Sequence, residues 1–314
     1  MSIKIDWVPM AADTLTLYWS SSPFTLDTLP TDKVVLTPSS GTYTDTTVPA
    51  NTNRYYMIEA VKAGAATQYS QCMLYGNWAK TGPGNNTVLR GTWDAGYMGF
   101  VPVAQMFTIS GLRTALGSPS IGGPPADNTM TGWHKFIFKG KILFFPNNIC
   151  SSQGSTTWAQ IYNAGCVYGV DGPGAAPFDF TQIGAQPNIP VTVNQKKVVT
   201  VGTDSFMVRL PKNSTLPTGT SVPDRTTFKG SEWCELMCSL TTSIAAADVP
   251  LLQPYKWGDV QGVPYPLAAM QHFNGLSNLA ASNSNWSDYF GRNITVSPSG
   301  GWVTWVPVLE YIPS

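Results

Sequence analysis

The segment at residues 133–146, WHKFIFKGKILFFP, constrains the fold most, because it is the most apolar part of the chain and yet carries three lysines. The triplet Lys139-Gly140-Lys141 separates two short apolar runs, and a glycine between polar residues is typical of a tight hairpin turn. The side chains that should share one buried sheet face are Phe136, Phe138, Ile142 and Phe144. The lysines whose charged heads we expect in water are Lys135, Lys139 and Lys141. A core hairpin is the main interpretation, and a membrane-inserting tip is the alternative.

The N-terminal region shows the alternation of half-buried strands. In residues 14–20, TLTLYWS, the side chains of Leu15, Leu17 and Trp19 face one way and the intervening ones face the other. Residues 41–71 read as strand, turn and strand, and Tyr56 lies on an apolar face there. The pattern predicts a small β-sandwich over residues 1–75 with Trp19 in its core.

This region resembles a fibronectin type III-like sandwich. Trp19 matches the strand tryptophan of such modules, and Tyr55 or Tyr56 matches their tyrosine near the start of strand F. The match covers residues 6–72, which is shorter than the roughly 100 residues of a complete sandwich. The resemblance therefore implies that one strand is missing or is supplied from elsewhere.

The rest of the chain changes character. Residues 76–96 are rich in Gly and Asn and predict a linker, so a larger domain should span 97–314. Short helices are expected at 103–116 and at 230–240, where one apolar stripe holds Trp233, Leu236, Met237 and Leu240. The expected strands cover 134–138, 142–146, 191–194, 197–202, 205–210 and 302–311. The predicted class is α+β and strand-rich, a small sandwich followed by a larger mixed domain.

Six stretches occur in an order that resembles a family of tailed-bacteriophage virion proteins. They are GYMGFVP (96–102), WHKFIFKGKILFFP (133–146), WAQIYNAGCVYG (158–169), VVTVGTDSFMVRL (198–210), GSEWCELM (230–237) and WVPVLEY (305–311). The resemblance covers about residues 95–312. Val306 stands where the family's ending usually has arginine, which implies the loss of a buried charge contact. We also expect the terminal run 305–311 to lie beside the hairpin, because both need a sheet partner.

A looser likeness connects the C-terminal pattern with C-type lectin-like folds. This likeness implies a calcium-dependent sugar-binding site, in which oxygen atoms would bind the calcium ion. The tripeptide Gln186-Pro187-Asn188 is similar to the sugar-contacting one of such lectins, and Asn283 to Asp288 could form a degenerate second half. The contiguous Trp-Asn-Asp of lectins is absent, and ordinary loop chemistry explains both stretches.

Composition argues against several classes of partner. Charged residues make up 11% of the chain and the formal net charge is zero, so no long-range field favours nucleic acid. No run approaches the roughly 20 apolar residues of a membrane helix, and the N-terminal stretch has no signal-peptide pattern. The odd set of five cysteines contains no C-x-x-C. They are read as small buried hydrophobes, with a stray disulfide as the alternative: Cys72, Cys150, Cys166, Cys234 and Cys238.

The sequence offers little for catalysis. The two histidines, His134 and His272, stand in apolar settings and are interpreted as structural. Glu232 and Glu235 are the one close pair of acids on an expected helix, and a first helical turn explains them through the helix dipole. We therefore predict no catalytic residue, no metal and no cofactor; a virion-borne hydrolase is the third and weakest hypothesis.

Tryptophans in polar or glycine-rich settings are the remaining candidates for binding, because aromatics stack on sugars or anchor protein interfaces. They are Trp78, Trp93, Trp257, Trp286 and Trp302. The hypothesis is a non-enzymatic structural component of a tailed-phage virion, at the tail, baseplate, collar or capsid, made in the host bacterial cytoplasm. Its partners would be other virion proteins and copies of itself. The alternative is a receptor- or carbohydrate-binding adhesin of the phage tail.

Overall fold

The computed structural model describes these residues of the chain: 2–9, 11–117, 119–123, 129–151, 156–174, 192–212, 214–216, 231–232, 235–236, 267–274, 277–281, 294–296 and 303–313. Antiparallel strands dominate and helices are few, which confirms the predicted α+β, strand-rich class.

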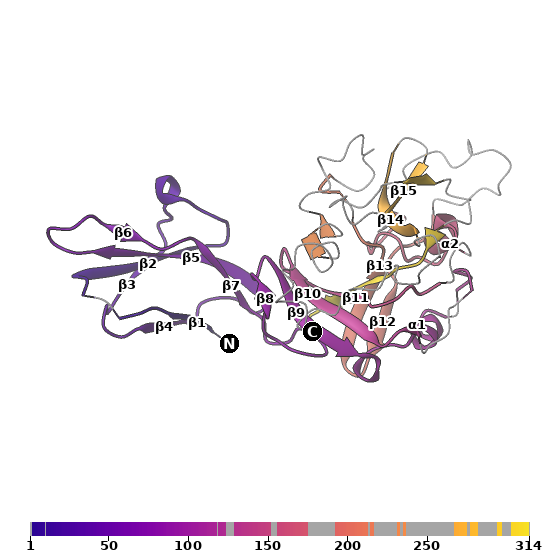
Figure 1. Ribbon diagram of the computed structural model, residues 1–314, viewed down its shortest axis with the longest axis horizontal. Coiled ribbons are helices and arrows are strands. Elements are labelled where there is room, and N and C mark those ends of the chain that lie inside the picture. The colour runs from indigo at the N-terminus through magenta and orange to yellow at the C-terminus, as the bar shows by residue number, and fades with distance from the viewer. Residues whose placement is uncertain are drawn as a thin grey trace, which may run out of the picture. The chain divides into compact units, whose positions relative to one another are not determined.

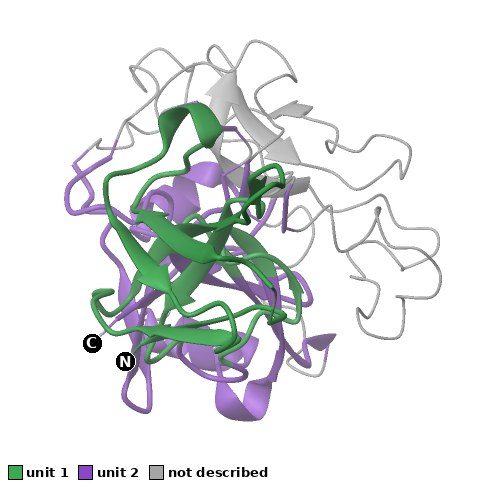
Figure 2. Cartoon of the chain, turned by 90° about the vertical axis from the view of Figure 1, so that its left-hand side faces the viewer, with its two compact units in different colours: residues 1–81, 86–96, 137–140 green, residues 82–85, 97–136, 141–314 purple. Residues whose placement is uncertain are grey.

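The chain divides into two compact units, drawn in green and purple in Figure 2. The first comprises residues 1–81, 86–96 and 137–140. The second comprises residues 82–85, 97–136 and 141–314. Most of the segment that the sequence predicts as a linker, 76–96, thus belongs to the first unit, and it holds the end of one strand, all of a second and the start of a third.

The first unit contains two antiparallel sheets (Figure 1). The smaller one pairs β1 (Ile3–Asp6) with β4 (Thr42–Asp45). The larger one has the order β3-β2-β5-β6, and β7 also pairs with β5. Its bounds are β2 (Thr14–Ser20), β3 (Lys33–Leu36), β5 (Thr52–Val61), β6 (Gln68–Tyr69) and β7 (Met73–Asn77), with a 3-10 turn η1 at Leu26–Thr28.

Alternation along β2 builds the core of this unit. Leu15 and Leu17 are fully buried and join one cluster with Ile3, Ile5 and Tyr56, which the two sheets contribute jointly. The opposite face of β2 is also covered, in a second cluster of Tyr18, Phe24 and Met57. Trp19 packs against the first cluster but is only partly buried, so it lies at the margin of the core that the sequence assigned to it.

A seven-stranded sheet has the order β12-β13-β18-β11-β10-β9-β8. Its strands are β8 (Arg90–Gly91), β9 (Ala95–Pro102), β10 (Gly132–Phe138), β11 (Lys141–Pro146), β12 (Val198–Val201), β13 (Asp204–Arg209) and β18 (Val308–Ile312). Strand β18 lies between β13 and β11, with Leu143 opposite Glu310. The expected place of the terminal run beside the hairpin is therefore confirmed.

The hairpin itself turns where the sequence indicates. Lys139 and Gly140 have φ angles of 47° and 74°, and two consecutive positive φ values define the two-residue turn that matches the twist of paired strands. The four apolar side chains expected in the core are buried, which confirms that part of the prediction. The lysine prediction was wrong at Lys135, whose side chain is fully buried because both faces of β10 are covered.

The other elements are shorter. A four-stranded sheet has the order β16-β15-β14-β17, with β14 (Leu267–Asn274), β15 (Ser277–Ala281), β16 (Ile294–Val296) and β17 (Val303–Thr304). The helices are α1 (Ile109–Ala115) and α2 (Trp158–Asn163), with a 3-10 turn η2 at Val103–Gln105. The helix expected at 103–116 forms in its second half, and most of the one expected at 230–240 lies outside the described residues.

One element of this region was not predicted from the sequence, and one predicted strand does not form. Helix α2 was not expected, although Thr157 and Gln160 form a capping box that marks its start. The strand expected at 191–194 is absent from its described part, 192–194. There the Asn194 side chain accepts the backbone N–H of Lys196 at 2.8 Å, a local bond that competes with extended pairing.

Candidate functional site

Two of the five tryptophans proposed as surface contacts lie among the described residues, and they differ in burial. Trp78 is buried, and its indole N–H donates to Asn53 Oδ1 at 2.8 Å, so the structure corrects its assignment to the surface. Trp93 is partly buried beside Gly76, where an added Cβ would lie 2.5 Å from its ring. Both side chains thus pack within the first unit. The other three, Trp257, Trp286 and Trp302, lie outside the described residues.

Among the described side chains, no hydrogen bond joins the candidate catalytic residues His134, Glu232 and Glu235 to one another. His134 is buried, and burial lowers its pKa to about 4, so it is neutral at pH 7. Its Nδ1 lies 3.4 Å from the Tyr97 hydroxyl. Glu232 is buried and Glu235 is partly buried. Of His272, only the backbone in β14 is described.

Glu232 is held in a buried network of charges in the second unit. Both of its carboxylate oxygens accept from Arg209, at 2.8 and 2.7 Å. Arg209 Nε also donates to Glu310, whose other oxygen pairs with Lys141 at 2.7 Å. Burial by itself would lower the pKa of Arg209, but Glu232 and Glu310 outweigh it and raise that pKa. The carboxylate of Glu232 is therefore committed to structure.

Lys135 is the centre of a second group of buried polar contacts. Its ammonium donates to the backbone carbonyls of Asn85, Pro83 and Gly82 at 2.7, 2.9 and 3.3 Å. It also lies 5.5 Å from the ring centre of Phe144. Burial lowers the pKa of Lys135 to about 7, with Asp204 opposing the shift. Because three carbonyls match the three N–H groups of an ammonium, this lysine holds the loop at 82–85 against β10 within the second unit.

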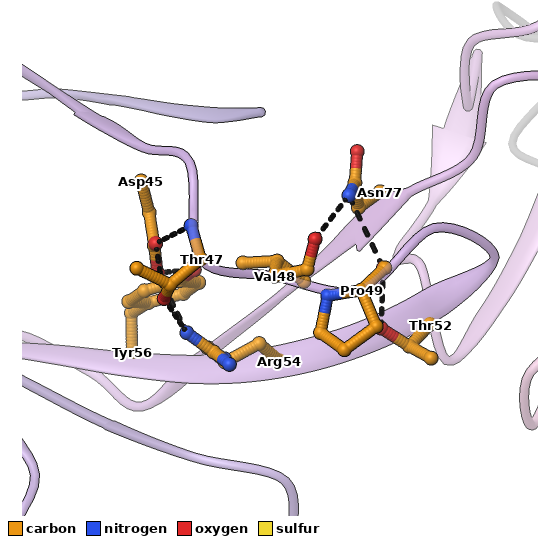
Figure 3. Close-up of polar contacts among 8 residues, drawn as sticks. All are labelled: Asp45, Thr47, Val48, Pro49, Thr52, Arg54, Tyr56 and Asn77. Carbon is orange, nitrogen blue, oxygen red and sulfur yellow. Dashed lines mark hydrogen bonds and ion pairs between the residues drawn. The ribbon is translucent and has the colours of Figure 1, made fainter. Parts of the chain in front are cut away.

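A polar cluster also stiffens the first unit (Figure 3). Asp45, at the end of β4, accepts from the Tyr56 hydroxyl at 2.8 Å, from Arg54 at 2.9 Å and from Thr47. Burial alone would raise the pKa of Asp45, but these donors lower it. Asn77 donates to the carbonyls of Val48 and Pro49 on the same connection. The cluster fixes the segment between β4 and β5.

One face of the five-stranded sheet, opposite the cluster of Leu15 and Leu17, is buried at Thr16 and Tyr18 and exposed at its edges. The strand registers place Val35, Thr16, Glu59 and Tyr69 in one row across β3, β2, β5 and β6. Val35 is 69% exposed and Tyr69 is 38% exposed. The carboxylate of Glu59 accepts from the hydroxyls of Tyr69 at 2.7 Å and Tyr18 at 3.0 Å. We call this row, with Tyr18, the tyrosine–glutamate face.

This face was not predicted as a site from the sequence. Alternation placed Tyr18 and Glu59 on the side of their strands away from Leu17 and Ile58, which is the signal that could have found it. The missing information was strand register, because only the pairing of β2 with β5 and of β5 with β6 brings the two tyrosines to one carboxylate.

Other chemistry is not assembled within the described ranges. No group of three His, Cys, Asp or Glu side chains there is placed to hold a metal. The cysteines Cys72, Cys150 and Cys166 are free, and burial raises the thiol pKa of Cys166 to about 12, which makes it a poor nucleophile. Among these residues, no helix has the length and apolar character to cross a membrane. The lectin-like stretches and Cys234 and Cys238 lie outside them.

No family model, curated protein or solved structure matches the chain.

Proposed function

We propose that the chain is a non-enzymatic structural component of a tailed-phage virion that works through protein–protein assembly. The order of six motifs between residues 96 and 311 supports the class of particle. The observation that carries the assembly role is the tyrosine–glutamate face, where the exposed side chains of Val35 and Tyr69 lie in one row with a carboxylate that two tyrosine hydroxyls hold. Such a mixture of aromatic and polar groups is typical of protein interfaces.

The arrangement of charge fits this role. The buried charged groups Arg209, Glu232, Lys135 and Asp45 are all held by partners within their own units. They therefore stiffen the two units, and a stiff surface loses little conformational entropy when a partner binds. The tyrosine hydroxyls likewise hold Glu59 in one position before any contact forms.

The first experiment asks whether the 33.9 kDa chain is part of the particle. Particles purified from infected cells would be analysed by mass spectrometry and labelled with an antibody against the chain. We expect a fixed copy number and labelling at one position on the particle. Abundant chain in the lysate together with none in purified particles would contradict the proposal.

The second experiment tests the face. Val35→Lys places a charge in the row and should reduce incorporation into particles while the chain stays folded. Leu89→Lys is the matched control, since Leu89 is 62% exposed and lies outside the sheet. Equal incorporation of both variants would show that assembly uses another surface.

The alternative, a receptor- or carbohydrate-binding adhesin, is favoured by the same carboxylate. A fixed acid beside a partly exposed tyrosine ring can accept sugar hydroxyls while the ring stacks on the sugar. A glycan array probed with the full chain separates the two functions: specific binding that Glu59→Gln abolishes supports the adhesin, and a blank array supports assembly.

A further inference from the structure

Strand β1 leaves one edge of the two-stranded sheet without a strand among the described residues. Just after the strand, the Trp7 N–H donates to the Gly41 carbonyl at 2.9 Å, in line with the β1–β4 register. Antiparallel strands exchange backbone bonds at every second residue, so Ile5 and Ile3 also turn their backbone groups toward β4. The two residues that alternate with Ile3, Ile5 and Trp7 turn their backbone groups toward the open edge.

Those residues are Lys4 and Asp6, and they carry opposite charges. Both side chains lie on the face away from the core, 64% and 59% exposed, with Lys4 Nζ 2.9 Å from Asp6 Oδ1. The open edge therefore offers backbone donors and acceptors together with one positive and one negative side chain. An edge of this kind is a template for another strand.

We propose that two copies of the chain join antiparallel through β1, about a two-fold axis that passes beside Ile5. In this register Lys4 lies opposite the partner's Asp6, and Asp6 lies opposite the partner's Lys4. Each of these pairs is a hydrogen-bonded pair, because its backbone groups already point to the edge. The joined sheet would have the order β4-β1-β1-β4, with alternating charges along its outer face.

The charge pattern selects this register. A two-fold axis at Ile5 is self-complementary, so the same residues supply both halves of the interface. Opposite charges directly across an antiparallel pair are favourable and like charges are unfavourable. Lys4 and Asp6 of the two copies would form a ring of alternating charges.

The other lateral edge with an exposed valine, β3, fits a second copy less well. The Trp19 N–H donates to the Asp32 carbonyl, and by the same two-residue rule Lys33 and Val35 turn their backbone groups outward. A symmetric pairing about Val34 would set the charge of Lys33 against the partner's Val35. No complementary charge is available there.

This inference deepens the proposed assembly function and rests on it for its place in the particle. A contact of one strand from each copy is smaller than the roughly 1,200–2,000 Å² of stable interfaces, so we expect a weak dimer. A symmetric particle raises the effective concentration of the copies, which makes a weak self-contact sufficient.

The test uses charge exchange in the full chain. Sedimentation at rising concentration should show the native chain moving from 33.9 kDa toward twice that mass. Lys4→Asp and Asp6→Lys should each remain monomeric, since each sets like charges opposite one another. A mixture of the two variants should restore the dimer, because the acidic edge of one then meets the basic edge of the other.

A cross-link detects the complex where it is weak. Lys4→Cys mixed with Asp6→Cys should form a disulfide-linked dimer, since opposite residues lie about 5.5 Å apart. Either variant alone should link far less, because its cysteines are diagonal neighbours at roughly 7–8 Å. Lys33→Asp is the control and should leave dimerisation unchanged.

Two results would overturn the inference: a native chain that stays monomeric and gives no mixed cross-link, or a dimer that Lys33→Asp abolishes and Lys4→Asp leaves intact. Neither result removes the proposed assembly function, which depends on incorporation into particles. Conversely, a β1-dependent dimer of a chain that is absent from particles would uphold the contact and contradict the function.

Discussion

Arg209 holds Glu232 with both terminal nitrogens of its guanidinium, at 2.8 and 2.7 Å, and both side chains are buried. The planar fork of arginine matches the two carboxylate oxygens, so the pair fixes the position and orientation of both groups. Because Glu232 stands 23 residues after Arg209, the last residue of β13, this contact joins two separate parts of the second unit.

Arg209→Met should destabilise the second unit by about 3–5 kcal/mol, because the variant leaves the buried charge of Glu232 without its main partner. Urea unfolding followed by a probe in this unit measures the change. Arg209→Met combined with Glu232→Leu should recover part of the loss, since no unpaired charge then remains at the pair.

The matched control is an exposed ion pair. Lys196 lies 2.9 Å from Asp171, with both side chains about half exposed or more. Lys196→Met should change stability by less than about 1 kcal/mol. An Arg209→Met variant as stable as this control would show that the buried pair is replaceable.

The second unit should lose stability in mild acid through His134. The pKa of His134 is about 4 in the folded chain, and its ordinary value in water is 6.5. As the pH falls, the unfolded chain therefore binds the proton at a higher pH than the folded chain does. The contribution of neutral His134 to the free energy of unfolding is fully present above pH 6.5. It is lost as the pH drops toward 4, by up to about 3 kcal/mol. Urea unfolding at pH 7, 6 and 5 measures the slope.

His134→Phe separates this effect from the carboxylates, which also titrate in acid. The variant keeps a ring against Tyr97 and Phe100 but cannot be protonated. Between pH 6.5 and 5 its stability should fall less steeply than that of the native chain. Identical slopes would mean that His134 takes up its proton without unfolding the unit.

Removing the ammonium of Lys135 should cost stability as well. Lys135→Met keeps an unbranched chain in the same space but leaves three carbonyls without this donor, at a cost of about 1–3 kcal/mol. Proteolysis near residues 82–85 should become faster. Lys139→Met is the control, because Lys139 is exposed and should be nearly neutral.

The fate of Lys135 shows where sequence reasoning stops. Apolar runs around a glycine were sufficient to place the hairpin, since the local pattern determines both strands and their turn. Burial on both faces of β10 was not predictable, because the carbonyls that hold Lys135 come from residues 82–85, about fifty positions earlier. The same holds for Arg209, Glu232 and Glu310, which come from separate segments.

For the surfaces too, local pattern determines some features and contacts between distant strands determine the others. Alternation in TLTLYWS predicted that Leu15 and Leu17 share one face, and it did not predict that Thr16 and Tyr18 on the other face are buried as well. Which polar residues meet was decided by register, as for Tyr18 and Tyr69 on Glu59. Register depends on pairing between distant strands, and a single sequence carries only weak information about it.

Tyr56→Phe should weaken the first unit by about 1.5–3 kcal/mol, since its hydroxyl donates to the buried carboxylate of Asp45 at 2.8 Å. Tyr75→Phe is the matched control, because within the described part of the chain its hydroxyl makes a long contact of 4.0 Å with Met73 Sδ and no hydrogen bond to a carboxylate. Thermal unfolding of both variants compares the two hydroxyls. If the two variants unfold at the same temperature, Arg54 and Thr47 are sufficient to hold Asp45 in place.

The last prediction concerns the turn of the hairpin. Gly140 has a φ of 74° and no atom within 4 Å of an added Cβ, so Gly140→Ala tests backbone strain without a steric clash. It should cost about 1–2 kcal/mol, the penalty of a side chain in the left-handed region. Lys139→Asn should instead stabilise the hairpin, because asparagine tolerates the φ of 47° at that position better than lysine. Urea unfolding of the two variants and the native chain should rank Lys139→Asn first and Gly140→Ala last. The reverse order would mean that the turn at residues 139–140 is not the type that the two positive φ angles define.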